Sequence, residues 1–256
     1  MSLSAARPSP YITMPHRAMF RNHHVPSDAA EARRLAALDM AAALRAGRCP
    51  TDRAFDRFLP DDLRGVSGHY WTPVAVAKRA AEWLNDLKIR TVVDIGSGAG
   101  KFCVVAALVG QCRVTGLEQR RSLVASARAL VQLLELRDRV SFVHGALGTM
   151  ATPSADAYYL YNPFGHYFFG PDHADPSVES SVTRQAQDVA MVEALLRQAP
   201  IGTYVVTYNG FGGRVPDTYR LIRVDDTLPN ALRLWRKERS TPRRGLVRRR
   251  PSLTFV

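Results

Sequence analysis

The sequence predicts an α/β protein with a doubly wound, mostly parallel seven-stranded sheet, a C-terminal antiparallel hairpin strand and an N-terminal helical extension. From residue 72 onward, short apolar runs typical of strands alternate with segments that carry an apolar face at helical spacing. The strand runs are continuously apolar, as in parallel strands covered on both faces. The last two expected strands have no helix between them, which favours an antiparallel pair at one edge of the sheet.

The expected elements follow one another along the chain. The first helix covers 27–47, where Ser27 can cap its start and Gly47 can end it. The second covers 72–87 and has Pro73 in its first turn. The remaining expected strands are 90–96, 112–118, 139–145, 155–162, 202–210, 219–224 and 231–238, and the remaining expected helices are 100–110, 120–136 and 177–199. Because each parallel crossover returns over a face of the sheet, we expect helices on both faces.

Length and composition indicate one main domain. A chain of 256 residues, 46% of them hydrophobic, can bury one good-sized core. We expect this domain at 66–238, after a flexible N-terminal segment at 1–26 and a helical extension at 27–65. A basic C-terminal tail follows at 239–256.

Cysteine use and hydropathy bear on the compartment. The three cysteines show neither a CxxC pair nor metal-ligand spacing, which fits a reducing compartment. Since no apolar run approaches the roughly 18 residues of a membrane helix, we expect no membrane span. The first 27 residues lack an apolar signal core, and although a transit peptide would share their basic, acid-free composition, we expect a cytoplasmic protein. No metal site is expected, because His166 and His173 have Asp172 between them but no evident third ligand.

Positive charge is concentrated near the end of the chain. The net charge is +12, and residues 213–256 hold twelve Lys/Arg against four Asp/Glu. The segment RSTPRRGLVRRR at 239–250 alone contains six arginines. Such a run attracts nucleic acid or another polyanion, or it is a solvated tail that aids solubility. No aromatic residues lie among these arginines, so base stacking on them is not expected.

A glycine-rich loop, DIGSGAG at 94–100, follows the strand at 90–96 and opens a helix. Glycines at such a turn let the backbone approach a ligand closely. The third glycine comes one residue earlier than in the dinucleotide fingerprint G-x-G-x-x-G, and Lys101 takes the sixth position. The carboxylate of Asp94, just before the loop, suits a ligand with an ammonium group better than a pyrophosphate.

A second acid, Glu118, ends the strand at 112–118, eighteen residues after Gly100. An acid at this place can accept hydrogen bonds from both hydroxyls of a ribose. A nicotinamide site would use the same acid, so Glu118 alone does not separate the two kinds of cofactor. The other interpretation is an exposed acid at a strand end.

The stretch VVDIGSGAGKF followed by VTGLE resembles the class I S-adenosylmethionine-dependent methyltransferases, over about residues 66 to 237. The resemblance implies that Asp94 and the loop hold the methionine end of S-adenosyl-L-methionine and that Glu118 holds its ribose. Many members bind the adenine amino group through an Asp after the third strand, where this chain has Ala146, which leaves adenine to backbone groups or to His144. The cofactor-binding residues implied are Tyr70, Thr72, Asp94, Gly96, Ser97, Gly98, Gly100, Glu118, Gln119, Gly145, Ala146 and Asn162.

Two further stretches resemble parts of amino-methyltransferases. GHYWTP at 68–73 is similar to the (F/Y)xTP element that packs over the methionine part of the cofactor, or it is a capped helix start with buried aromatics. Asn162, Pro163 and Phe164 resemble the (D/N/S)PP(F/Y/W) motif, whose amide and backbone carbonyl accept hydrogen bonds from the acceptor nitrogen. Here Phe164 replaces the second proline and Gly165 the aromatic residue. Asn162 is therefore either an acceptor contact or an ordinary turn residue.

The resemblance implies a transferase that uses S-adenosyl-L-methionine, with N-methylation of a protein or nucleic-acid acceptor as the first hypothesis. Methyl transfer depends mainly on positioning, although His166 could serve as a base. Two alternatives stay open: methylation of a small molecule under a lid formed by the helical extension, and a non-catalytic cofactor-binding protein with a nucleic-acid-binding tail. The glycine spacing opposes a hydride-transferring enzyme.

Overall fold

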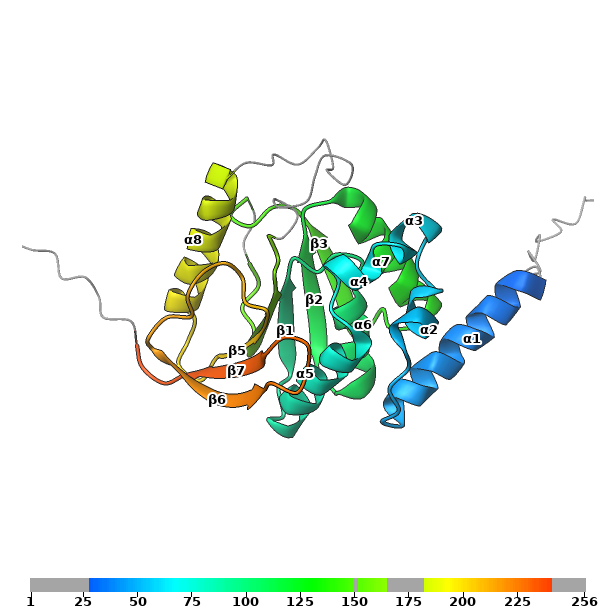
Figure 1. Ribbon diagram of the computed structural model, residues 1–256, viewed down its shortest axis with the longest axis horizontal. Coiled ribbons are helices and arrows are strands. Elements are labelled where there is room, and N and C mark those ends of the chain that lie inside the picture. Colours follow the sequence, from blue (N-terminus) through cyan, green and yellow to red (C-terminus); the bar gives the residue numbers. More distant parts are fainter. Residues whose placement is uncertain (1–27, 150–151, 165–181, 241–256) are drawn as a thin grey trace, which may run out of the picture.

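The computed structural model describes residues 28–149, 152–164 and 182–240 and shows a central sheet with helices on both faces (Figure 1). The seven strands lie in the order β3-β2-β1-β4-β5-β7-β6. Their bounds are β1 (Thr91–Ile95), β2 (Arg113–Glu118), β3 (Val140–His144), β4 (Ala157–Tyr161), β5 (Tyr204–Tyr208), β6 (Tyr219–Asp225) and β7 (Leu232–Lys237). The first five strands pair in parallel, and β7 is antiparallel to both β5 and β6. The predicted fold class is confirmed.

Eight described helices accompany the sheet. They are α1 (Asp28–Arg45), α2 (Asp52–Asp56), α3 (Asp61–Arg64), α4 (Ser67–Tyr70), α5 (Val74–Asp86), α6 (Lys101–Val109), α7 (Arg121–Leu133) and α8 (Val182–Gln198). The predicted start of the last helix, at 177, falls outside the described residues. Helices α2, α3 and α4 lie between the predicted helices at 27–47 and 72–87, where none was expected, because each is too short to show helical periodicity in the sequence.

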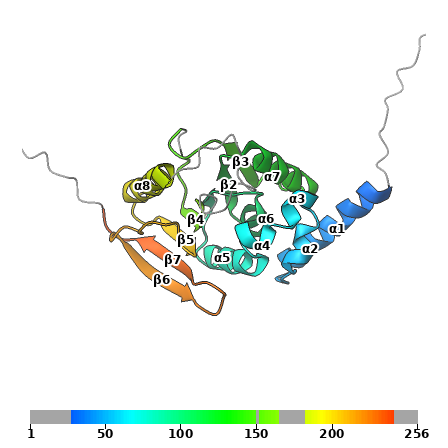
Figure 2. The ribbon, with the colours of Figure 1, turned by 45° about the horizontal axis from the view of Figure 1, so that its top comes forward.

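Two apolar layers enclose the sheet. One layer joins alternate strand residues such as Val92 and Val114 to α1, α5, α6 and α7, and here the rings of Phe102 and Tyr159 stack with centroids 3.6 Å apart. The other layer joins residues such as Val93 to α8. Figure 2 shows α8 on one side of the sheet and α5 to α7 on the other. Burial on both faces explains why the parallel strands are almost continuously apolar.

The helical extension joins the main domain through a buried ammonium group. Lys101, the first residue of α6, is 1% exposed, and its Nζ lies 2.9 Å from Asp56 Oδ1 and 3.1 Å from Ser67 Oγ. Asp52 also pairs with Lys101 and accepts a hydrogen bond of 2.9 Å from the backbone N–H of Val74. Residues of α2, α4, α5 and α6 are therefore linked in one cluster of polar contacts around the ammonium group of Lys101. The expected division of the chain at residue 66 stays a prediction.

A second buried lysine ties the hairpin to α8. Lys237, at the end of β7, is 2% exposed and donates hydrogen bonds to the carbonyls of Leu196, Arg197 and Ala199. These carbonyls lie at the C-terminal end of α8, where a cation satisfies groups that the helix leaves unbonded. Across the described ranges, no helix combines the length and the apolar character that crossing a membrane requires.

Candidate functional site

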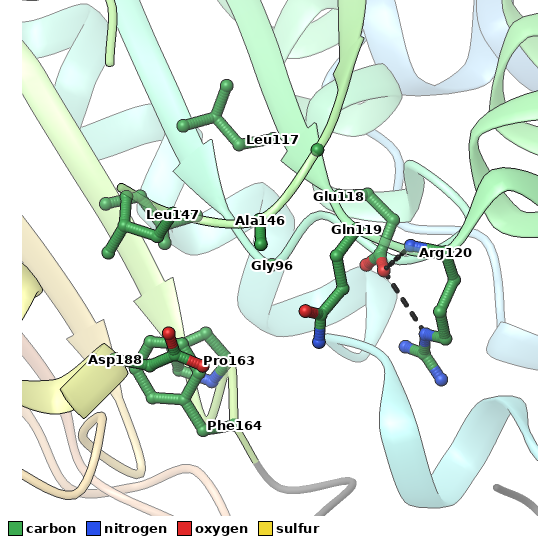
Figure 3. A pocket seen from close by; sticks show the side chains of 12 residues that line it. Gly96, Leu117, Glu118, Gln119, Arg120, Ala146, Leu147, Pro163, Phe164 and Asp188 are labelled. Carbon is green, nitrogen blue, oxygen red and sulfur yellow. Dashed lines mark hydrogen bonds and ion pairs between the residues drawn. The ribbon is translucent and has the colours of Figure 1, made fainter. Parts of the chain in front are cut away.

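A pocket lies where β1, β2 and β4 end at the same edge of the sheet (Figure 3). It holds about 410 Å³ of empty space when the open solvent at its mouth is counted. Ligands of open α/β sheets bind beyond the carboxyl ends of the strands, so the position itself indicates a ligand site. The residues that line it are Ile95, Gly96, Leu117, Glu118, Gln119, Arg120, Gly145, Ala146, Leu147, Pro163, Phe164 and Asp188.

The glycine loop has the backbone conformation that only glycine adopts freely. Gly96, Gly98 and Gly100 have φ angles of 77°, 54° and 80°. The N–H groups of Gly96 and Ser97 both donate to the carbonyl of Leu117, at 2.9 and 3.0 Å, and the N–H of Gly98 donates to Glu118. These three amides are therefore bonded within the protein.

Glu118 is fixed at the edge of the pocket by the loop and by its own turn. Its Oε2 accepts the N–H of Gly98 at 2.9 Å, and its Oε1 accepts the N–H and the Nε–H of Arg120 at 2.9 and 3.2 Å. The residue is only 4% exposed although it ends a strand at the protein surface. The carboxylate is thus held in one orientation beside the pocket, which excludes the interpretation of Glu118 as an exposed strand-end acid.

Asp94 lies under the loop, outside the pocket lining. It is 3% exposed, and the thiol of Cys103 donates to its Oδ2 at 3.3 Å. Burial raises the pKa of this carboxyl to about 7, and the charge of Glu118 adds to the rise while the Cys103 bond opposes it. A nearby ammonium group would lower the pKa again, because it favours the charged form.

The GHYWTP stretch covers the other side of the loop. Thr72 Oγ1 lies 3.0 Å from the hydroxyl of Tyr159, and burial raises the pKa of that tyrosine well above its usual value. The indole of Trp71 packs on Gly98: a Cβ on that glycine would lie 2.4 Å from Trp71 Nε1. Among the described residues Trp71 Nε1 has no hydrogen-bond partner, and neither has the buried Oγ of Ser97. Both atoms belong to segments that the sequence assigned to the cofactor.

The end of β4 packs directly on the glycine loop. A Cβ on Gly96 would lie 2.7 Å from Pro163 Cβ, so no larger residue fits there. Asn162 has a φ of 40°, which Asn tolerates better than most residues, and its N–H donates to the carbonyl of Gly210 at 2.9 Å. Phe164 is 7% exposed and lines the pocket. Gly165 and His166 lie outside the described residues, as do Asp172 and His173.

The far side of the pocket contains a residue that sequence reasoning missed. Asp188 on α8 is 2% exposed, and its Oδ1 accepts a hydrogen bond of 3.1 Å from Arg184 Nε. It lies on the buried stripe of α8 with Val192 and Leu196. An acid at such an otherwise apolar position is unusual, and this pattern in the sequence could have identified Asp188. His144, the residue considered for adenine, contacts the carbonyl of Gln119 at 3.0 Å and does not line the pocket.

The predicted site residues therefore fall into two groups. Gly96, Glu118, Gln119, Gly145, Ala146, Pro163 and Phe164 line one pocket, whereas Tyr70, Thr72, Asp94, Ser97, Gly98, Gly100 and Asn162 lie outside that lining. The apolar side chains and the fixed carboxylate of this lining are the kinds of group that contact a flat ring and accept hydrogen bonds from hydroxyls. Across the described residues, no group of three His, Cys, Asp or Glu side chains is placed to hold a metal ion.

Comparisons with known proteins give one family match over part of the chain and likenesses to solved structures. The model of the protein-L-isoaspartate(D-aspartate) O-methyltransferase family matches residues 67–160, and no curated protein matches the sequence. The chain is similar to the solved structure of an RNA methyltransferase from Salinibacter ruber in complex with S-adenosyl-L-homocysteine (24% identity, 67% of this chain and 96% of that one, TM-score 0.49). It is also similar to cofactor-bound Rv0187 from MTB (19%, 85% and 94%, TM-score 0.47) and to an O-methyltransferase family protein from Burkholderia thailandensis (13%, 75% and 60%, TM-score 0.47).

The matched residues 67–160 include the glycine loop and Glu118 and end two residues before Asn162. They therefore cover the segments assigned to the cofactor, while the acceptor side lies beyond them. The antiparallel pair β6 and β7 at one edge of the sheet agrees with the predicted C-terminal hairpin, and in the observed order β7 lies between β5 and β6. The chain thus combines a Rossmann-like fold with a partial match to a methyltransferase family model, in keeping with the sequence resemblance to class I S-adenosylmethionine-dependent methyltransferases, and its acceptor subfamily is not identified.

Proposed function

We propose that the protein transfers the methyl group of S-adenosyl-L-methionine to a nitrogen atom of a protein or nucleic-acid acceptor. When bound, this cofactor supplies an electrophilic methyl group on a sulfonium. We assign its ribose to Glu118 and its adenine to the part of the pocket beside Gln119, Gly145 and Ala146. Its methionine end is assigned to the glycine loop, with the ammonium group near Asp94.

The position of Asn162 is the observation that carries this proposal. Strand β4 pairs with β1, so Asn162 follows the strand beside the one that leads into the glycine loop. The contact between Pro163 and Gly96 holds the Asn-Pro turn against that loop. The hydrogen bond from Asn162 N–H to the Gly210 carbonyl fixes the backbone, which leaves the side-chain amide as the adaptable group.

The chemistry asked of Asn162 is positioning. An amine nitrogen attacks with its lone pair in line with the S–CH₃ bond; the N–CH₃ bond forms as the S–CH₃ bond breaks, and a proton leaves the nitrogen for water. A carbonyl oxygen that accepts one N–H bond orients that lone pair, and correct placement alone can be worth orders of magnitude in rate. Phe164 and Tyr161 supply apolar walls for the acceptor group.

The basic end of the chain supports a polyanionic acceptor. Residues 239–250 contain six arginines, and we propose that they contact nucleic acid or a similar polyanion. Most of this tail, from residue 241, lies outside the described residues. The proposal therefore rests on charge alone.

The test is transfer of a radiolabelled methyl group to separated protein, RNA and metabolite fractions of a cell extract. We expect base-stable label in the protein or RNA fraction. Asn162→Gly keeps the positive φ without strain and removes the amide, so it should lower transfer by about 10- to 100-fold at saturating cofactor.

Three outcomes contradict parts of this proposal. Base-labile label would indicate an oxygen acceptor, and label confined to metabolites would indicate a small-molecule enzyme. Unchanged transfer by Asn162→Gly would remove Asn162 from the acceptor site. Cofactor binding without any label would identify a non-catalytic binding protein.

A further inference from the structure

A groove runs along the edge of the sheet where the parallel strands begin, opposite the edge that holds the pocket beside Glu118. It consists of two adjoining hollows, one over the starts of β1, β2 and β3 and one over the starts of β1 and β5. Both hollows are lined by Thr91, Ser154 and Ala155, so they are continuous, and we call them together the basal groove. Its lining residues lie in 88–93, 113–115, 137–141, 153–156 and 200–204. None of them lines the pocket beside Glu118.

The sheet is polar where it forms the floor of the basal groove. Val93 belongs to the apolar layer under α8, and Thr115 and Ser141 follow it across the parallel register. Residues in register point to the same face, and the hydroxyls of Thr115 and Ser141 lie 3.2 Å apart. Arg113, two residues before Thr115, points to this face as well. Ser141 is exposed and Thr115 is half-buried, so the apolar layer ends here and water reaches the sheet.

Four exposed cations surround this floor. Lys88 and Arg90 precede β1. Arg113 begins β2, and Arg137 lies in the turn before β3. Within the described residues, none of these four side chains takes part in a hydrogen bond, an ion pair or a ring contact. Their charges are therefore available to an anionic ligand.

The charge balance of the basal groove is positive. Arg139 adds a fifth cation, which two backbone carbonyls hold at 2.8 and 3.0 Å. The lining acids are Asp138 and Asp156. Asp156 accepts two backbone N–H groups from the chain that leads into β1, each at 3.0 Å, so part of its hydrogen-bonding capacity is already used. Five cations against two acids leave a formal charge of +3.

The shape and chemistry of the basal groove suit a chain of phosphates. Strands lie about 4.8 Å apart, so the starts of β3, β2, β1, β4 and β5 extend over roughly 19 Å, enough for several phosphates of one strand. Arginine and hydroxyl side chains are common phosphate contacts, and hydroxyls can also bond the 2′-hydroxyl of RNA. Among the described lining residues, Ile201 is the one large apolar side chain that is exposed. This offers little of the apolar core that a protein interface contains.

We propose that the basal groove binds the phosphate backbone of single-stranded RNA. The proposal goes beyond methyl transfer and does not require it, because the groove shares no residue with the pocket beside Glu118. It is also separate from the C-terminal arginines, since all the lining residues lie before residue 239.

The test is fluorescence anisotropy of the full chain with a dye-labelled single-stranded RNA at several salt concentrations. The double variant Arg113→Gln with Arg137→Gln removes two cations of the groove and keeps the tail. Each lost phosphate contact should reduce the logarithmic salt slope by about 0.7, so the double variant should lose about 1.4. At about 0.1 M salt this means binding that is roughly 10- to 30-fold weaker. Both side chains are exposed and unpaired, so the thermal midpoint should not change.

Arg48→Gln with Arg53→Gln is the matched control. Both arginines are exposed, belong to the helical extension and lie outside the basal groove. This variant has the same change in net charge and should keep the wild-type salt slope.

Three outcomes overturn the proposal. The first is an unchanged salt slope in the groove variant, and the second is an equal loss in the control, which would show a general effect of net charge. The third is tighter binding of polyglutamate or of DNA of the same sequence than of RNA, which would identify another occupant. Failure of S-adenosylhomocysteine to bind would leave this inference intact, and an unchanged salt slope would leave the proposed cofactor intact.

Discussion

At the scale of single residues, Glu118 is the side chain that we propose to hold the ribose of the cofactor. Three donor groups already orient its carboxylate: the N–H of Gly98, and the N–H and Nε–H of Arg120. A carboxylate held in this way needs no reorganisation when hydroxyl groups arrive, so its hydrogen bonds to ribose are made without an ordering cost.

Replacing Glu118 by Ala should weaken S-adenosylhomocysteine by about tenfold or more, because hydrogen bonds to a charged acceptor contribute about 1.5–3 kcal/mol each. Glu118→Gln should be milder, since one acceptor oxygen remains. Calorimetry gives both values. Glu82→Ala is the control, because it removes a partly exposed acid of α5 that pairs with Lys78. This variant should bind S-adenosylhomocysteine as wild type does. An equal loss of affinity in the control would contradict the assignment of the ribose to Glu118.

Asp94 makes stability depend on pH. Its pKa is about 7 in the folded protein and 3.8 in the unfolded chain, so between these values the folded state holds a proton that the unfolded state has lost. This contribution to stability is fully present below pH 3.8 and is lost as pH rises towards 7. The loss should amount to about 1.4 kcal/mol per pH unit within that window.

Asp94→Asn tests this pH dependence without ligand. The amide resembles the protonated acid and does not titrate, so its free energy of unfolding should rise relative to wild type between pH 5 and 7. Chemical denaturation at several pH values measures the difference. A difference that stays constant with pH would show that Asp94 does not titrate in this range.

At the scale of elements, Lys101 connects the helical extension to the glycine loop. Lys101→Met leaves Asp56 and Asp52 beside α6 without their cation. Removing one partner of a buried ion pair costs about 3–5 kcal/mol of stability. We expect the lower end of that range, because the side chain of Asp52 is 42% exposed. Denaturant unfolding checks the loss. Arg220→Gln, which breaks an exposed pair with Glu238, should cost less than about 1 kcal/mol. Similar losses for both variants would refute a special role for Lys101.

The elements could be predicted from the sequence, whereas their side-chain connections could not. Strand runs and helix caps are local signals, so the elements from 72 to 238 lie where the alternation places them. In the sequence, Lys101 stood out only because it takes the place of the third glycine of the dinucleotide fingerprint. Its contact with Asp56 could not be predicted, because the two residues are 45 positions apart in the chain. Asp188 had a local signal in the sequence, because it is an acid on the apolar stripe of α8. Its position in the same pocket as Ala146 could not be predicted, because it depends on how α8 packs on the sheet. The contact of Pro163 with Gly96 likewise depends on strand order.

At the scale of the whole molecule, a pocket lies at one edge of the sheet, and the sequence carries a run of arginines after its last strand. A chain that ends at Ser240 lacks five of the six arginines in 239–250. We expect it to bind RNA more weakly than the full chain, with a shallower dependence on salt, while its affinity for S-adenosylhomocysteine is unchanged. Filter binding at several salt concentrations measures this, and equal salt slopes for both chains would exclude a contact through the tail.

The central claim is that the pocket beside Glu118 binds the cofactor of a methyltransferase. Calorimetric titration of the full chain with S-adenosylhomocysteine tests it most directly. We predict saturable binding at one site per chain, lost or strongly weakened in Glu118→Ala. A wild-type protein that folds and shows no saturable binding of this ligand would contradict the claim.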